Sequence, residues 1–381
     1  MKNSSLLVLL SGLIIFGCGR HESKSVVQRH ATDDLTITLV DAPKAKTKIR
    51  IEPIASVLDQ TGWSVGTCVS RDGSTIYGKA GSKRNTNEMY SKDIQVFVRS
   101  RGKQSVALGP DTRAVNPIGT AENGNIWLAN VANSGRETGV RLYDRSGSLI
   151  TSVLSLSRRR SDAEAISKDG KTIVGQIESD SGFGFEGFVW TDNNGLSLLG
   201  PDSTAKDVTN DGLKVCGEKK NGDGYSEAFT WTKADGFSWL GDLKGGNFQS
   251  RADCISGDGT VVIGRGWSQS GHNKLFTWSK ASGMTEVEDA RWSPVPLDTS
   301  DDGSITVGYE NNGSDNSAFI LTKDFGFEYL KDFLKRNDVD ATDWKRFESA
   351  ESVSGDGQTI VGTGRTNENN QTAFILTIAG G

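Results

Sequence analysis

The sequence has little of the chemistry that enzymes and metal sites most often use. It contains three histidines in 381 residues, and two of them lie in a polar N-terminal stretch, which leaves His272 alone in the remainder. A catalytic triad needs a histidine held by a carboxylate, and zinc sites need several histidines or cysteines at matched spacing. His272 stands in a polar loop pattern, Ser-Gly-His-Asn-Lys. We therefore expect no triad, no metal centre and no catalytic residue that can be singled out.

Basic charge and long apolar runs are also scarce. The formal net charge is −5, which argues against nucleic acid as a partner because phosphate binding needs a concentrated basic face. The apolar stretch at residues 6–16 is too short to span a bilayer as a lone helix. Of the four cysteines, Cys68, Cys216 and Cys254 occur within the repeats described below. We expect them to be small buried hydrophobic residues rather than disulfide partners.

The N-terminus has the pattern of an export signal that ends at a lipid attachment site. Lys2 precedes the apolar stretch, as in a secretory signal, and residues 15–18 read Ile-Phe-Gly-Cys. This ending resembles the lipobox of bacterial lipoproteins, with Phe16 in place of the usual small or aliphatic residue. The resemblance implies that residues 1–17 are a signal peptide and that Cys18 is acylated. The alternative is a plain signal peptide cleaved near the same point.

The segment that follows, residues 18–34, begins with the lipidated Cys18 and continues as a polar stretch of mixed charge without periodicity. Such a composition is typical of a flexible tether. The partner expected for this part is the membrane, reached through the lipid anchor, because several acyl chains anchor a protein stably. Gly19, rather than Asp, follows the cysteine. By the same resemblance this implies an exported lipoprotein at the outer membrane or cell surface.

The sequence is rich in glycine, with 46 glycines against seven prolines, and it contains a repeated sequence motif. Six copies share a hydroxyl residue two before an Asp, a Gly directly after the Asp and a second Gly six after it. These copies start at Ser70, Ser167, Thr209, Ser256, Ser300 and Ser354. A weaker copy starts at Ala121, with Asn123 for the Asp and Ala129 for the second Gly. We call the Asp, or Asn123, the marker residue of its unit.

Each unit predicts four short antiparallel strands. A strand ends at the hydroxyl residue, and the Asp-Gly pair is expected to form a two-residue hairpin turn in which both residues have positive φ. A β-branched strand such as residues 172–174 follows, then a polar loop, a strand that opens with Phe such as residues 188–191, and a last strand. Seven such units predict an all-β fold, a seven-bladed β-propeller, over residues 35–381.

The last unit stops at Gly381, before its fourth strand, while a spare strand at residues 48–58 precedes the first unit. We expect this N-terminal strand to pair into the last blade and close the ring, which removes exposed sheet edges. One insertion, residues 331–344, is partly helical in pattern. The loops between second and third strands are expected on one face, where they would bind a ligand, and the connections between units on the opposite face.

Residues 227–231 (Glu-Ala-Phe-Thr-Trp), 240–246 and 255–259 resemble the HAF-repeat family of bacterial extracellular proteins. The resemblance covers roughly residues 60–381 and implies export and a repeat fold, with no activity to carry over. The histidine that gives the family its name is absent from every copy. Its place is taken by Gln95, Glu186, Glu227, Lys274, Ser317 and Thr372.

Aromatic residues outside the repeated positions are the candidate ligand contacts. Trp267 with Arg265 and Trp292 with Arg291 lie in polar stretches, and aromatic residues beside arginine are recruited by sugar-binding and protein-binding surfaces. A covering role is the alternative for both tryptophans. No metal ligand is assigned and no cofactor is expected, apart from a weak surface calcium site at acidic clusters such as residues 298–302.

Two functions fit these observations. The first is a lipid-anchored extracytoplasmic propeller that acts as a binding or scaffold module for a protein or glycan. The second is a polysaccharide-active enzyme, a hydrolase or lyase with its site in the central funnel, since carboxylate pairs for glycan chemistry come from residues remote in sequence. The lack of a catalytic signature favours the first.

Overall fold

The computed structural model describes residues 6–8, 14–16, 48–58, 62–82, 94–108, 115–132, 137–290 and 293–379. The chain divides into two compact units, one of Met1–Lys48 with Ala379–Gly381 and one of Ile49–Ile378. In the first unit, β1 (Leu6–Val8) pairs antiparallel with β2 (Ile14–Phe16). Within the described ranges, no helix has the length and apolar character needed to cross a membrane. Cys18, the tether and residues 35–47 lie outside these ranges.

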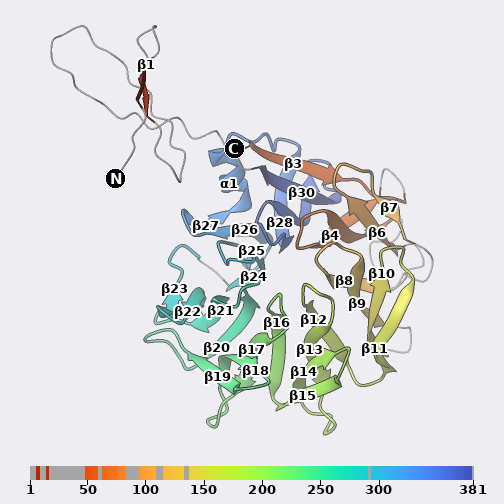
Figure 1. The fold of residues 1–381 in the computed structure, drawn as a ribbon, viewed down its shortest axis with the longest axis vertical. Coiled ribbons are helices and arrows are strands. Elements are labelled where there is room, and N and C mark those ends of the chain that lie inside the picture. Colours follow the sequence, from red (N-terminus) through yellow and green to blue (C-terminus); the bar gives the residue numbers. More distant parts are fainter. Residues whose placement is uncertain are drawn as a thin grey trace, which may run out of the picture. The chain divides into compact units, whose positions relative to one another are not determined.

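The second unit is a ring of seven four-stranded antiparallel sheets (Figure 1). Blade 1 is β4 (Trp63–Val69), β5 (Thr75–Gly81), β6 (Ile94–Ser100) and β7 (Val106–Ala107), and blade 2 is β8 (Val115–Thr120), β9 (Ile126–Ala132), β10 (Thr138–Asp144) and β11 (Leu149–Ser157). Blade 3 is β12 (Ser161–Ile166), β13 (Thr172–Glu178), β14 (Phe185–Thr191) and β15 (Gly195–Pro201), and blade 4 is β16 (Ser203–Val208), β17 (Lys214–Lys220), β18 (Ser226–Thr232) and β19 (Gly236–Gly241).

The ring continues through three further blades. Blade 5 is β20 (Ser250–Ile255), β21 (Val261–Trp267), β22 (Asn273–Ser279) and β23 (Gly283–Glu286), and blade 6 is β24 (Ser293–Thr299), β25 (Ile305–Asn311), β26 (Asn316–Thr322) and β27 (Gly326–Tyr329). Blade 7 is β28 (Trp344–Val353), β29 (Thr359–Thr366), β30 (Gln371–Ala379) and the N-terminal β3 (Lys48–Ile54). The predicted seven-bladed propeller and its closure by an N-terminal strand are confirmed.

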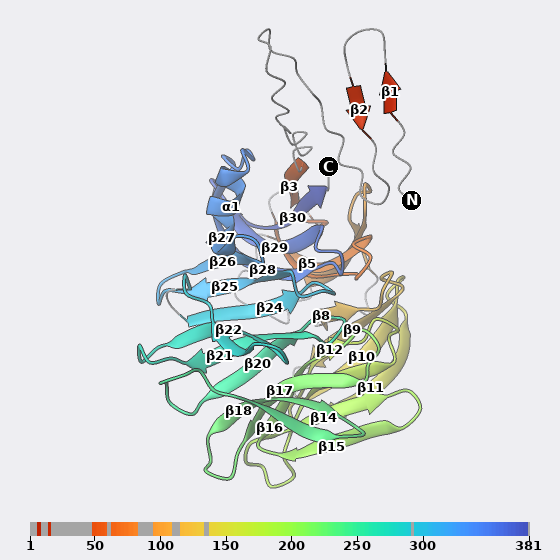
Figure 2. The ribbon, with the colours of Figure 1, turned by 60° about the vertical axis from the view of Figure 1, so that its left-hand side comes forward.

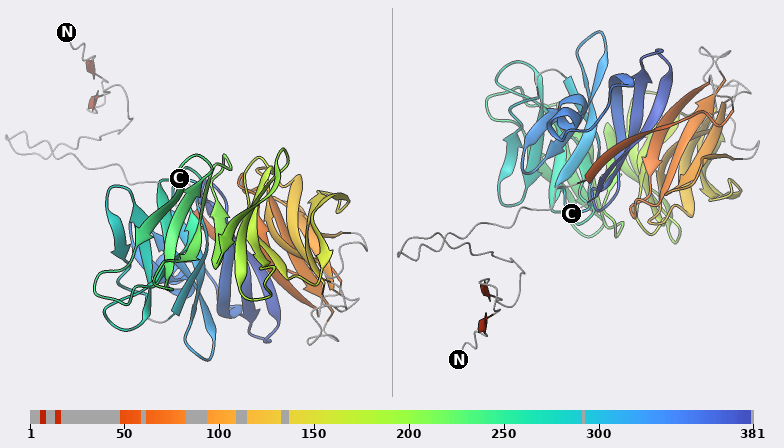
Figure 3. Two further views of the ribbon diagram at one scale, coloured as in Figure 1. Left: turned by 90° about the horizontal axis from the view of Figure 1, so that it is seen from below. Right: turned by 90° about the horizontal axis from the view of Figure 1, so that it is seen from above.

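The first strand of each blade lies next to the first strand of the following blade, so these seven strands surround the axis of the ring. Side views in Figures 2 and 3 show the blades standing beside one another around that axis. Each blade packs apolar side chains against its neighbour. The core is therefore a series of clusters between blades rather than one central core.

The repeated motif forms the turn between the first and second strands of each blade. In blade 1 the Ser70 hydroxyl donates to Asp72 Oδ1 (2.6 Å) and accepts from the Thr75 amide (2.9 Å), while the Ser74 amide donates to the same carboxylate oxygen (2.9 Å). The Gly73 amide donates to the Ser70 carbonyl. The Asp is thus a turn residue, as expected.

The expected two-residue turn is wrong in its geometry. Gly73 has a φ of 66°, but no marker Asp appears among the described residues with positive φ. The hydrogen bonds from Ser70 to Thr75 and from Gly73 to Ser70 enclose a longer turn of type I geometry, with glycine at its fourth position. In this longer turn the Asp does not need a left-handed backbone conformation. Its carboxylate accepts a hydrogen bond from a turn amide that a tighter turn would pair with a carbonyl.

The second repeated glycine makes room for an aromatic ring. A Cβ on Gly175 would clash with the Asp162 carbonyl oxygen and lie 2.9 Å from Cε1 of the fully buried Phe188. Blade 2 has Ala129 at this position, and its partner on the third strand is Arg141 rather than Phe. Glycine therefore recurs wherever the third strand brings a phenylalanine across it.

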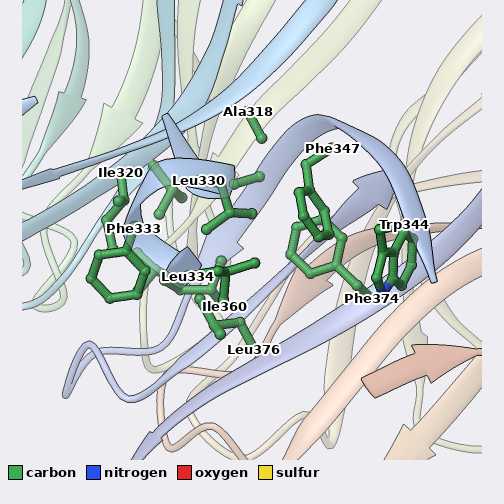
Figure 4. Close-up of a cluster of buried hydrophobic side chains, with 13 residues drawn as sticks. Ala318, Ile320, Leu330, Phe333, Leu334, Trp344, Phe347, Ile360, Phe374 and Leu376 are labelled. Carbon is green, nitrogen blue, oxygen red and sulfur yellow. The ribbon is translucent and has the colours of Figure 1, made fainter. Parts of the chain in front are cut away.

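Closure of the ring depends on β3 and on a serine that links it to its neighbours. The Ser64 hydroxyl donates to the Ile54 carbonyl (2.5 Å) and accepts from the Ala373 amide (3.0 Å). Ile54 is fully buried. The predicted helical insertion is α1 (Leu330–Arg336), and Figure 4 shows its buried Leu330, Phe333 and Leu334 packed into the cluster shared by blades 6 and 7.

A ring of backbone hydrogen bonds joins the seven turns to one another. In each bond the donor is the backbone amide of the marker or of the residue before it. The acceptor is the carbonyl of the residue before the marker in the next blade. The seven bonds, of 2.7–3.2 Å, run from Asp72 to Glu122, Glu122 to Lys168, Lys168 to Asn210, Asn210 to Gly257, Asp258 to Asp301, Asp301 to Gly355 and Gly355 to Arg71. We call this closed circuit the turn collar.

Candidate functional site

The candidate site is the central channel, because the innermost strands direct one polar position into it. The residue five before each marker lines the channel in every blade. These residues are Thr67, Ile118, Glu164, Lys206, Asp253, Leu297 and Glu351. Charged side chains occupy four of these seven positions. This regularity was present in the sequence, and sequence reasoning missed it because the channel wall cannot be recognised until the innermost strand is known.

The channel has two chambers that share four lining residues. An inner chamber of about 100 Å³ is lined by Arg71, Asp207 and Asp298, among others. An outer chamber of about 660 Å³ is lined on one side by Lys79, Ser349 and other residues. Both chambers touch Ile118, Glu164, Leu297 and Glu351. Ligand pockets typically measure about 300–1,000 Å³, so the outer chamber alone has the size of a ligand site.

Arg71 lines the inner chamber next to the turn collar. Its guanidinium donates to Asp301 (3.0 and 2.7 Å), to Asp298 (3.3 Å) and to the carbonyl oxygen of Thr299 (3.2 Å). Burial works against the charge, but the two carboxylates outweigh it and hold the Arg71 pKa above its ordinary value. Arg71 is therefore a fixed, charged part of the wall of the inner chamber.

The outer chamber opens on the face that carries the loops between second and third strands. Its rim includes Ser314 and Asp315 from the loop between β25 and β26, and Gln371 at the start of β30. The expected separation of these loops from the connections between blades is wrong. In a blade of four antiparallel strands, the second strand ends on the same side as the fourth. Both kinds of connection share this loop face, and the turn collar lies on the other.

Most charges of the wall are paired with one another. Lys206 Nζ lies 2.6 Å from Glu164 Oε1. Asp253 accepts from Arg265 Nε (2.9 Å) and Nη2 (3.1 Å), and Arg251 Nε lies 2.9 Å from it. Burial alone would raise the pKa of Asp253, but Arg265 and Arg251 outweigh it and lower that pKa. These groups form a fixed polar wall rather than free reactive groups.

Two aspartates at the bulge of the first strand bind the backbone of the next blade. Asp207 accepts from the amides of Val208 (2.7 Å) and Ile255 (2.9 Å). Asp298 repeats the arrangement with the amides of Thr299 (2.8 Å) and Val353 (2.9 Å). Unlike Asp298, Asp207 has no cation bound to it in the part of the chain that the structure describes. Burial, with a smaller contribution from Asp298, raises the pKa of Asp207 to about 7.

The structure places the predicted ligand residues apart from this channel mouth or outside the described residues. Trp267 and Arg265 line a separate depression of about 240 Å³ between blades 4 and 5, together with Glu218, Gln249 and Arg251. Trp267 is half-buried, and the Arg265 guanidinium is bound to Asp253. A ligand role for this pair stays a prediction. Arg291, Trp292 and Cys18 lie outside the described residues.

In the described part of the chain, no group of three or more His, Cys, Asp or Glu side chains could hold a metal ion. The three cysteines predicted to be buried are free and buried. Burial raises the pKa of the Cys68 thiol to about 12.

The ring of seven four-stranded sheets defines a seven-bladed β-propeller, and comparison with solved structures agrees. The β-propeller domain of the Trilobed protease from Pyrococcus furiosus matches 82% of this chain and 95% of its own, with 11% identity and a TM-score of 0.56. An oligogalacturonate lyase, solved in complex with manganese, matches 88% of this chain and 98% of its own, with 11% identity and a TM-score of 0.54.

A third similar structure is TolB from Acinetobacter baumannii, with 14% identity over 70% of this chain and a TM-score of 0.50. The match spans 62% of the TolB chain. At these identities the likeness establishes the fold alone. No known family profile matches the chain, and no curated protein matches it in sequence.

Proposed function

We propose that this protein is an exported, lipid-anchored binding module that takes a protein or glycan ligand into the outer chamber on its loop face. The observation that carries the proposal is the outer chamber. It measures about 660 Å³, and its rim includes residues of the loops between second and third strands. A chamber of this size on a loop face suits recognition of a chain end or a protruding loop. HAF-repeat character is part of the same proposal.

The test fills the mouth with bulky side chains. Ser314 is exposed and Gln371 half-exposed at the rim, so the double variant Ser314→Trp with Gln371→Trp should fold normally and bind ligand at least about ten-fold more weakly, a loss of about 1.4 kcal/mol. Ligands would be found on a glycan array and by affinity capture, then measured by calorimetry. The matched control is Ser270→Trp, an exposed loop residue of blade 5 outside the chamber lining. Unchanged binding by the double variant would contradict the proposed site.

Enzymatic turnover is the second candidate, and one observation favours it. Burial raises the pKa of Glu351, which reaches the ligand-sized chamber, and a carboxyl group tuned in this way suits general acid catalysis. The same glycans should therefore be assayed for chain cleavage. Cleavage that disappears in Glu351→Gln, while binding persists, would favour the hydrolase or lyase over the binding module.

The lipid anchor is tested separately. Cys18→Ser removes the thiol that would be acylated, so we expect the exported protein to leave the membrane fraction and to lose metabolic fatty-acid label, because the remaining chain has no lipid to partition into the bilayer. Fractionation of parent and variant, with the label followed in both, measures this. A parent that incorporates no fatty acid, together with a variant that still sediments with membranes, would show that the anchor is wrong.

A further inference from the structure

One repeat position on the second strand binds polar groups in blades 2 to 5. This position lies seven residues after the marker. Asn130 exchanges hydrogen bonds with the backbone of Ala163 in the next blade (3.0 and 2.8 Å). Gln176 accepts from Thr204 of the next blade (3.3 Å). The charged members behave likewise, since Glu218 lies 3.5 Å from Arg251 and Arg265 binds Asp253.

Lys79 occupies this position in blade 1 and departs from the pattern. Among the described residues, its ammonium makes no hydrogen bond and no ion pair, although the side chain is only partly exposed and lines the outer chamber. Burial lowers the pKa of Lys79, partly offset by the charge of Glu351. A partly desolvated ammonium without a partner is unfavourable unless an anion reaches it. The folded protein therefore bears a desolvation penalty at Lys79, whereas the equivalent residues of blades 2 to 5 have partners.

The other cation of the outer chamber is already used. Arg346 is bound to Asp315 (2.5 Å) and to Glu348 (3.1 and 2.9 Å). On the acidic side, Glu164 is paired with Lys206, whereas Glu351 accepts only the hydroxyl of Ser349 (2.5 Å) among the described residues. Lys79 and Glu351 influence each other's charge without forming an ion pair. Among the described residues, the chamber thus holds one ammonium without a partner and one carboxyl group with free acceptor capacity.

We infer that the outer chamber recognises a carboxylate on its ligand through Lys79, with a neighbouring hydroxyl or ammonium of the same ligand donating to Glu351. The inference rests on the proposed function and names the chemistry of that site. Two sources supply this chemistry, the uronic acid end of an acidic glycan and the end of an amino acid or peptide. Charge-assisted hydrogen bonds of this kind are shorter and stronger than neutral ones.

The experiment measures binding of matched pairs that differ at the carboxylate. Glucuronate is compared with glucose, and alanine with alaninamide, by calorimetry and saturation-transfer NMR on the full-length chain in detergent. We expect at least one carboxylate to bind more tightly than its partner. Lys79→Met should weaken that binding about 10- to 100-fold, the size of a hydrogen bond to a charged group. Lys79→Arg should retain most of it, and Lys171→Met, at an exposed turn of blade 3, should change nothing.

The melting temperature supplies a second readout. If Lys79 had a purely structural role, replacing it would lower the melting temperature. Because Lys79→Met removes an unpaired, partly buried charge, its melting temperature should equal or exceed that of the parent. Lys79→Gln serves if the methionine variant fails to fold. Glucuronate alone would indicate an acidic glycan, alanine alone a peptide end, and either supports the inference.

Two outcomes overturn it. One is a parent that binds neither carboxylate, and the other is a Lys79→Met variant that binds them as the parent does. The mouth-filling variant separates this failure from failure of the proposed function. If Ser314→Trp with Gln371→Trp abolishes ligand binding while Lys79→Met does not, the site stands and the carboxylate inference falls. If neither variant changes binding, both fall.

Discussion

A chain that lacks residues 1–54 will not form a stable propeller. The deletion removes β3, which supplies the outer strand of blade 7. Ile54 is fully buried, and Ile49 and Ile51 pack on the cluster between blades 6 and 7. Full burial of an aliphatic side chain such as Ile54 contributes about 1.5–3 kcal/mol, and the half-buried Ile49 and Ile51 contribute less. The lost hydrogen bonds to β30 add to this. The sum is comparable with the lower end of the stability of a typical domain, about 5–15 kcal/mol.

The matched control is a chain that lacks only residues 1–34, which removes the leader and tether and keeps β3. Circular dichroism melts and size-exclusion chromatography compare the two. We expect the shorter deletion to melt cooperatively and the longer one to aggregate or to show no cooperative transition. Equal melting of both would mean that blade 7 does not need its N-terminal strand.

The second large effect is expected at Arg71, in the wall of the inner chamber. Arg71→Leu leaves Asp298 and Asp301 without the cation that lies between them, and it removes the donor to the Thr299 carbonyl. Breaking a buried pair from one side costs about 3–5 kcal/mol. The Arg71 side chain is 16% exposed, and those of Asp298 and Asp301 are 22% and 33% exposed, so solvent reduces the expected loss to about 2–4 kcal/mol.

The loss should depend on pH in a defined direction. Asp207 has a pKa of about 7, above its ordinary value, and the charge of Arg71 opposes that rise. Without Arg71 the ionised carboxylate becomes less favourable still in the folded state. An acid with a raised pKa in the folded state binds more protons when folded, so stability falls as pH rises. The deficit of Arg71→Leu relative to the parent should therefore grow as pH rises through 7.

Urea denaturation at several pH values measures this deficit. The control is Arg160→Leu, which breaks a pair with Asp162 in which the arginine side chain is 63% exposed, and exposed pairs contribute about 0–1 kcal/mol. A variant at position 71 that is no less stable than this control would show that the ion pairs of Arg71 with Asp298 and Asp301 contribute little to stability.

The number of blades and the closure could be predicted because both follow from local signals in the chain. Six copies of one turn and one spare strand are visible without any knowledge of packing. The turn geometry was predicted wrongly because the Asp-Gly pair favours a two-residue turn in isolation. Here the hydroxyl of Ser70 and the carboxylate of Asp72 bind backbone amides and stabilise a longer one.

The channel could not be predicted in the same way, because its chemistry joins residues far apart in sequence. Arg71 meets Asp298 and Asp301 across more than 200 residues. That Lys79 has no partner within the described ranges is visible only after the equivalent residues in blades 2 to 5 are seen to have theirs. Trp267 was chosen for its polar neighbours, but strand position rather than composition decides which side chains face the axis.

In the turn collar, the groups that join the blades differ from the groups that set the charge at this end of the channel. Its seven links are made by backbone amides and carbonyls, so the hydrogen bonds themselves use no side chain. The residue before the marker accordingly differs between blades and is Arg71, Glu122, Lys168, Asn210, Gly257, Asp301 or Gly355. Glycine occupies this position in two blades, where a Cβ would meet Asn210 or Asp301. The side chain at position 71 can therefore be exchanged, and the charge at this end of the channel changed, while the circuit that joins the blades stays intact.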